Sequence, residues 1–149
     1  MRLSSAIGGG IAGAVVVTLL HETVRRLYTE APRMDLLGME AMAKTLDSSD
    51  IAVPDKKALF NITMAADLVS NSLYYSIAGI GKEKQAVVRG TLLGVAAGLG
   101  AVYLPKPLGL NEAPATRTLQ TKIMTAALYT IGGGIAGAAV RLIENKSSF

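Results

Sequence analysis

Apolar residues in this chain gather in long blocks that contain almost no charge. Segments 3–20, 90–105 and 123–140 contain no charged residue, and segment 58–81 contains only Asp67. A helix needs roughly 20 mostly apolar residues to cross a hydrocarbon layer about 30 Å thick. The pattern therefore predicts an all-α integral membrane bundle of four transmembrane helices, in a single domain covering residues 1–149. The expected spans are 3–27, 58–81, 87–104 and 119–143.

Residues 28–57 form the expected extramembrane connector between the first two spans. One helical face within it carries the apolar residues Met39, Met42, Ala43 and Leu46. This periodicity predicts a short amphipathic helix in the first connecting loop. Such a helix could lie on the membrane surface or pack as a lid over the other helices, and the pattern leaves both open.

Glycines recur inside the apolar blocks in a pattern that indicates close helix packing. The octapeptide IGGGIAGA occurs at residues 7–14 and again at 131–138. The residues expected to pack the helices are Gly9, Gly13, Gly90, Gly94, Gly98, Gly133 and Gly137. Small residues at a spacing of four let two helix backbones approach closely within a membrane. Because the first and third spans leave the side of the termini and the fourth returns to it, we expect all three glycine patches in that half of the bilayer.

Polar side chains at helical spacing occupy the other half of the expected spans. Thr18, His21 and Glu22 share one helical face, and Thr63, Asp67 and Asn71 share another. We expect a polar cavity that opens toward the two longer connectors. Its expected binding or ion-pathway residues are Asp67, Asn71, His21, Glu22, Arg25, Thr63, Tyr74, Tyr103, Lys122 and Tyr129.

Asp67 is the strongest single candidate. An ionised carboxylate at membrane depth costs about 3 kcal/mol or more unless it is paired or neutralised. Arg25, His21 and Lys122 are the candidate counter-charges. A functional carboxylate on an ion path and a buried ion pair that fixes helix register are both consistent with the pattern.

The composition limits the chemistry further. Half of the chain is hydrophobic and 17% is charged, which is too apolar for an ordinary soluble domain of this size. There is no cysteine and one histidine, so neither thiol chemistry nor a metal site is expected, and no cofactor is expected. The net charge of +4 is spread around the spans, so no nucleic-acid partner is expected. No sequence context supports a nucleophile near Ser70, and a non-enzymatic function is favoured. We also expect the first helix to be retained, because VVVTLLHETV offers no signal-peptidase site.

Four segments carry a resemblance to known sequences. LLHETVRRL, EAPRMDLLGMEAMAK, LPKPLGLNEAP and TKIMTAALY, at residues 19–27, 30–44, 104–114 and 121–129, resemble a group of small four-span proteins of the bacterial inner membrane. The resemblance implies that membrane location and carries no function over.

Three functions fit these features. The first is transport or conduction of a proton, a cation or a small solute through the cavity around Asp67. The second is binding of a lipid or another hydrophobe beneath the amphipathic segment. The third is a structural subunit that assembles with other membrane proteins through its glycine grooves. The expected partners are membrane lipids and a homo-oligomer or a membrane-protein partner, and the distribution of basic residues favours cytoplasmic termini.

Overall fold

The computed structural model describes residues 3–146 and is helical throughout its regular secondary structure. Its elements in chain order are α1 (Leu3–Leu27), α2 (Met34–Ser48), α3 (Lys56–Ser76), the 3-10 turns η1 (Ile77–Gly79) and η2 (Glu83–Gln85), α4 (Ala86–Tyr103), α5 (Ala113–Thr116) and α6 (Leu119–Lys146). The all-α prediction is therefore confirmed for the described residues.

Three helices are long and apolar enough to cross a membrane. They are α1, the segment Glu83–Tyr103 that contains α4, and α6. The expected span at 58–81 is absent from this group, because α3 carries Asn61, Asp67 and Asn71 among its apolar residues. The sequence-based expectation of four apolar spans is thus met by three helices within residues 3–146, with α3 as a more polar companion.

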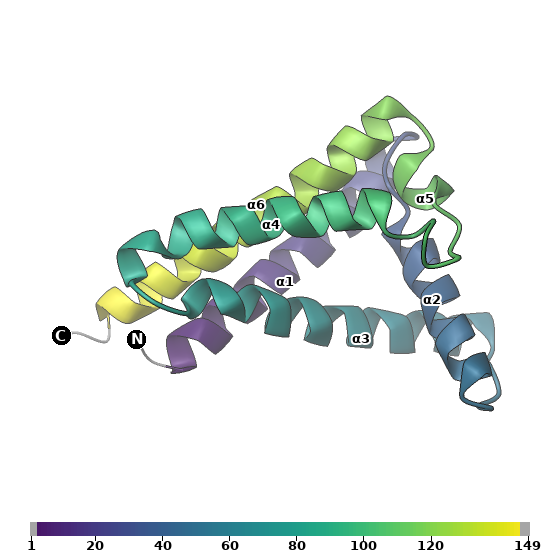
Figure 1. Ribbon diagram of the computed structural model, residues 1–149, viewed down its shortest axis with the longest axis horizontal. Coiled ribbons are helices and arrows are strands. Elements are labelled where there is room, and N and C mark those ends of the chain that lie inside the picture. Colours follow the sequence, from purple (N-terminus) through teal and green to yellow (C-terminus); the bar gives the residue numbers. More distant parts are fainter. Residues whose placement is uncertain (1–2, 147–149) are drawn as a thin grey trace.

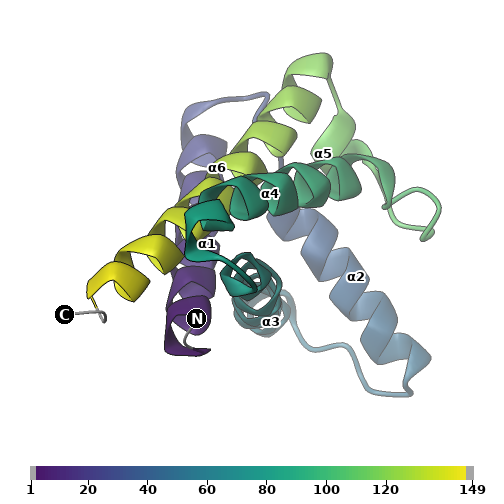
Figure 2. The same cartoon turned by 60° about the vertical axis from the view of Figure 1, so that its left-hand side comes forward.

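The long helices pack in antiparallel pairs around α6. Figures 1 and 2 show α6 beside both α1 and α4, and α3 beside α1. The start of α1 and the end of α6 meet at one end of the molecule, where the Ser5 hydroxyl donates to Glu144 Oε2 at 2.5 Å. Because α1 and α4 both run away from this end, α3 must return the chain to it.

Glycine backbones form the interface between α4 and α6. A Cβ atom added at Gly94 would lie 2.7 Å from Thr130 Cα, and one added at Gly98 would lie 2.7 Å from Ala126 Cα. Gly90 faces Gly133 and Gly137 in the same way. Since real Cβ atoms do not approach other atoms this closely, only glycine permits this backbone separation.

The two IGGGIAGA copies pack against one another across the interface of α1 and α6. A Cβ atom at Gly13 would lie 2.6 Å from Ala136 Cβ, and Gly9 meets Val140 and Ala136. Neighbouring glycines within each copy serve different partners. Gly10 faces the backbone of Ser72 on α3, whereas Gly9 faces α6. In the second copy, Gly132 faces α1 and Gly133 faces α4.

The helices spread at the end away from the termini. α3 and α4 diverge from their connection at η1, as Figure 1 shows, and the Tyr74 hydroxyl bridges them by donating to the Leu93 carbonyl at 2.8 Å. Farther along, α2, α5 and the α4–α5 loop occupy the wider end. The Arg33 amide donates to the Pro114 carbonyl at 2.9 Å, and the Asn111 amide donates to Glu40 Oε2 at 3.0 Å.

The helix expected in the first connector is present as α2. It packs on α3 and α5 as a lid, one of the two arrangements that the sequence left open. The face that lines the interior carries Leu37, Gly38 and Ala41 instead of the apolar face expected from Met39 and Met42. Gly38 fixes this rotation, because a Cβ atom there would lie 2.9 Å from Thr63 Cγ2 of α3.

Candidate functional site

A cavity of about 260 Å³ lies where α1, α2 and α3 spread apart beneath the α4–α5 loop. Most of its wall is apolar. The apolar lining residues are Val17, Met34, Leu37, Ala41, Met64, Leu104, Pro105, Leu108 and Leu110. The polar lining residues are Thr18, His21, Glu22, Asp35, Thr63, Asp67, Asn71 and Tyr129. The cavity is therefore an apolar space with a small set of polar groups, the usual character of a small-molecule site.

His21 enters the cavity from the polar face of α1. It is buried, and its Nδ1 lies 2.9 Å from the Val17 carbonyl oxygen. Because a carbonyl only accepts, a neutral His21 carries its proton on Nδ1 and presents Nε2 as an acceptor. The ring packs edge-on against Tyr129 of α6 with the centroids 5.1 Å apart. These contacts fix the ring and leave Nε2 without a partner in the described part of the chain.

Like His21 Nε2, two threonine hydroxyls of the cavity are buried without a hydrogen-bond partner in the described chain. Thr18 lies one turn before His21 on α1, and Thr63 projects from α3 where Gly38 of α2 approaches it. Their Oγ1 atoms are buried and have no hydrogen-bond partner among residues 3–146. A buried polar group without a partner costs about 1–3 kcal/mol. A cavity that contains three such groups can therefore hold water or a polar ligand at a net gain.

Asp67 lies one turn after Thr63 on α3 and lines the same cavity. The residue as a whole is exposed, so Asp67 lies on the side of the cavity that faces the surroundings. Asn71, one turn further along α3, lines the same cavity. Asp67 takes part in none of the ion pairs formed within residues 3–146.

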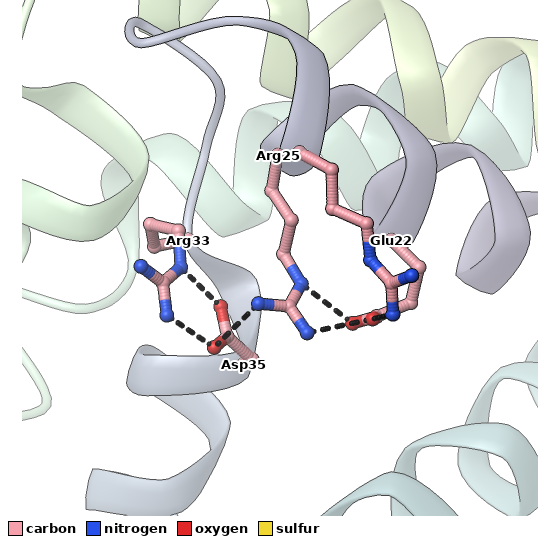
Figure 3. A network of polar contacts seen from close by, with 5 residues as sticks. Glu22, Arg25, Arg33 and Asp35 are labelled. Carbon is pink, nitrogen blue, oxygen red and sulfur yellow. Dashed lines mark hydrogen bonds and ion pairs between the residues drawn. The ribbon is translucent and has the colours of Figure 1, made fainter.

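The other two carboxylates of the cavity, Glu22 and Asp35, are bound by arginines that do not line it. Figure 3 shows the chain of contacts. Arg25 donates to Glu22 from Nε at 2.8 Å and from its terminal nitrogen at 2.6 Å, and its other terminal nitrogen lies 3.8 Å from Asp35. Arg33 donates to both oxygens of Asp35 at 2.9 and 2.7 Å. This leaves Asp67 as the unpaired carboxylate of the cavity among the described residues.

The environment of Asp35 sets its protonation. Burial alone would raise the pKa of this carboxyl group, but the Arg33 hydrogen bonds and the charges of Arg33 and Arg25 outweigh it. The pKa of Asp35 therefore lies below its ordinary value of 3.8. Asp35 is an anion at neutral pH, and it ties α2 to the end of α1.

The structure brings six of the ten sequence-predicted residues to the cavity. They are His21, Glu22, Thr63, Asp67, Asn71 and Tyr129. Arg25 lies outside and binds Glu22 and Asp35, so it is no counter-charge for Asp67. Tyr74 binds the Leu93 carbonyl where α3 still touches α4. Tyr103 is 67% exposed at the end of α4, and Lys122 is exposed on α6.

Sequence reasoning missed the part of the cavity that the connectors supply. Asp35 and Gly38 come from α2, and Leu104, Leu108 and Leu110 come from the α4–α5 loop. The signal for the loop was present in LPKPLGL, where leucines alternate with turn residues in a segment outside the spans. These leucines line the cavity, although Leu104 and Leu108 are 56% and 67% exposed.

The described residues contain no group of three histidine or carboxylate side chains placed to hold a metal ion. Comparison of the chain with protein-family models, curated proteins and solved structures finds no match. The function of the chain is therefore inferred from the cavity and from the helices around it.

Proposed function

We propose that this chain is a small membrane protein that binds a small cationic solute in the Asp67 cavity and carries it, or a proton, across the membrane. The observation that supports this proposal is the Asp67 carboxylate, which lines a mainly apolar cavity without an ion pair among residues 3–146. An organic cation matches this lining, because Asp67 supplies the charge and leucine and methionine side chains contact the body of the solute. Tyr129 adds an aromatic ring to the same wall.

In this proposal α3 is the fourth membrane crossing. α1 and α4 leave the same end of the molecule, so the chain between them has to return through the same thickness. The 21 residues of α3 span about 30 Å at 1.5 Å per residue, which matches the hydrocarbon layer. Its exposed apolar residues Ile62, Val69 and Leu73 would face lipid, while Thr63, Asp67 and Asn71 face the cavity.

The charge of Asp67 explains how such a site would couple binding to movement. An ionised carboxylate at membrane depth is costly, and a bound proton or cation removes the net charge. With a proton or cation bound at Asp67, the protein can therefore adopt conformations that are unfavourable while the carboxylate is charged and has no ligand. His21 and the hydroxyls of Thr18 and Thr63 offer polar contacts to the solute or to its water.

Asp67→Asn tests the proposal. We expect the variant to bind tetraethylammonium at least tenfold more weakly in calorimetric titrations in detergent, and to lose proton-linked uptake of this cation in proteoliposomes. Asp47→Asn, which removes an exposed carboxylate of α2, is the matched control. Neither variant should lose stability, because neither carboxylate forms an ion pair within the described chain. Equal tetraethylammonium affinity for Asp67→Asn and the parent chain would refute the proposal.

A second candidate is binding of a lipid or another hydrophobe, and the apolar wall formed by α2 and the α4–α5 loop favours it. Leu37, Leu104 and Leu108 present a surface that suits an acyl chain. Native mass spectrometry of the protein extracted in a mild detergent should then show a retained hydrophobic ligand. Ala41→Trp, which fills the cavity, should remove that ligand, whereas a protein that is empty in every preparation argues against this candidate.

We propose the inner membrane of a bacterium as the location, with the termini in the cytoplasm and membrane lipids as the immediate partners. The glycine grooves are filled by the chain's own helices, so a homo-oligomer or a membrane-protein partner would have to bind elsewhere. Exposed leucines such as Leu92 and Leu142 lie outside those grooves.

A further inference from the structure

A second cavity lies on the other side of Asp35, where the end of α1 meets the start of α3. It encloses about 410 Å³ and is open to the surface. Four basic residues line it, namely Arg25, Arg33, Lys56 and Lys57. Asp35 is the one acidic residue of its described lining. Basic groups thus outnumber acidic ones in this wall, and neither the Asp67 cavity nor the proposed transport uses it.

The arginines of this cavity are fixed in place, and each is paired with one carboxylate. Asp35 holds Arg33 through two hydrogen bonds, and Glu22 holds Arg25 through two more. A guanidinium group has more N–H donors than these contacts use, so both arginines keep donors for a ligand. Lys56 and Lys57 are exposed and form no ion pair with residues 3–146. The Asp55 carboxylate is turned to the helix end, where it accepts from the Lys57 and Ala58 amides.

The apolar part of the same cavity points to an amphipathic ligand. Leu36, Met39 and Phe60 line it beside the basic residues. Arg25 lies in the last turn of α1, and Lys56 and Lys57 lie in the first turn of α3. Basic residues that flank apolar helices stand at the depth of lipid phosphates, where they attract anionic lipids. A ligand with a phosphate and an acyl chain matches the basic residues, the apolar residues and the position of the cavity at the ends of the helices.

We propose that this cavity is a binding site for an anionic phospholipid. The phosphate contacts the two arginines and the two lysines, and the glycerol region and upper acyl chain contact Leu36, Met39 and Phe60. Since the ligand touches α1, α2 and α3 together, its binding stabilises the docking of the α2 lid. This proposal concerns a different site from the Asp67 cavity and does not depend on transport.

The test uses the full chain in nanodiscs or mild detergent with defined lipids. Native mass spectrometry should show phosphatidylglycerol retained in preference to phosphatidylcholine. Lys56→Gln/Lys57→Gln should weaken phosphatidylglycerol binding by about fivefold for each charge removed. Lys82→Gln/Lys84→Gln, which removes two lysines at the opposite end of the bundle, is the matched control and should keep the preference.

Three further measurements separate the outcomes. The preference for phosphatidylglycerol should decline as salt is raised, because surface charge interactions are screened. Asp67→Asn should bind phosphatidylglycerol like the parent chain, which keeps this proposal separate from the transport proposal. Inorganic phosphate should compete only weakly, because it lacks the acyl chain. Equal retention of the two lipids, an unchanged preference in the double lysine variant, or phosphate binding as tight as lipid binding would each overturn the proposal.

Discussion

Gly13 of α1 and Gly132 of α6 lie backbone to backbone at the centre of the bundle. A Cβ atom on Gly13 would lie 2.8 Å from the Gly132 carbonyl oxygen, and one on Gly132 would lie 3.3 Å from the Gly13 carbonyl oxygen. Each glycine belongs to one copy of IGGGIAGA, so the two copies pack against each other. This contact holds α1 and α6 together, and the two helices stay in contact as far as His21 and Tyr129, whose rings lie 5.1 Å apart.

Gly133→Ala should destabilise the bundle. The added methyl group would lie 2.7 Å from the Gly94 amide nitrogen and 2.8 Å from its Cα, so α4 would have to move away from α6. We expect a loss of about 1–3 kcal/mol, the usual cost of overpacking. This loss of unfolding free energy is measured by thermal unfolding in mild detergent. Gly134→Ala is the matched control, because its methyl group would meet only Thr91 Oγ1 at 3.5 Å. Equal melting temperatures for the two variants would contradict the packing described for α4 and α6.

The docking of α2 should depend on pH through Asp35. Its pKa in the folded chain lies below 3.8 because Arg33 and Arg25 outweigh the effect of burial. A lowered folded-state pKa means that the stabilisation is complete above the unfolded-state pKa and is lost as pH falls through the folded-state value. We expect α2 to loosen below about pH 4, as measured by hydrogen exchange of its amides. Asp35→Asn should show the looser exchange already at pH 7, and a parent-like exchange pattern in this variant would contradict the prediction.

Two threonines should respond oppositely to replacement by valine. The Thr125 hydroxyl donates to the Thr121 carbonyl at 2.8 Å and contacts the Ala115 carbonyl at 3.2 Å, so Thr125→Val should cost about 1 kcal/mol. Thr63 Oγ1 has no partner in the described chain, so Thr63→Val should leave the unfolding free energy unchanged or raise it. A large loss of stability in Thr63→Val would show that the cavity is part of a closed structural network.

The proposed crossing of α3 can be checked with single cysteines, since the chain contains none. Asp50→Cys lies before α3 and Lys82→Cys lies after it. If α3 crosses the membrane, a membrane-impermeant thiol reagent should label these two positions from opposite sides of sealed vesicles. Asn145→Cys, near the end of α6, should be labelled from the same side as Lys82→Cys. Labelling of positions 50 and 82 from one side would exclude α3 as a crossing.

The sequence by itself determined the long apolar helices. α1 covers 3–27 as expected, and α4 and α6 differ from the expected spans by at most a few residues. Uncharged runs of this length favour the helix in a membrane, so the existence and approximate place of these helices follow from composition. The glycine spacing also indicated which residues allow close approach, because that property belongs to the residue and its helical period.

Tertiary structure decided which neighbour each face meets. Periodicity places Tyr74 with Asp67 and Lys122 with Tyr129, but it does not give the rotation of a helix against its partners. Tyr74 therefore donates a hydrogen bond to the Leu93 carbonyl, and Lys122 is exposed on the surface. Asp67 and Tyr129 line the cavity. The contribution of α2 and the α4–α5 loop was equally hidden, since a connector acquires its inward side only by docking on helices distant in sequence. Local pattern fixes an element and its faces, whereas the choice of contacts depends on the free energy of the whole packed bundle.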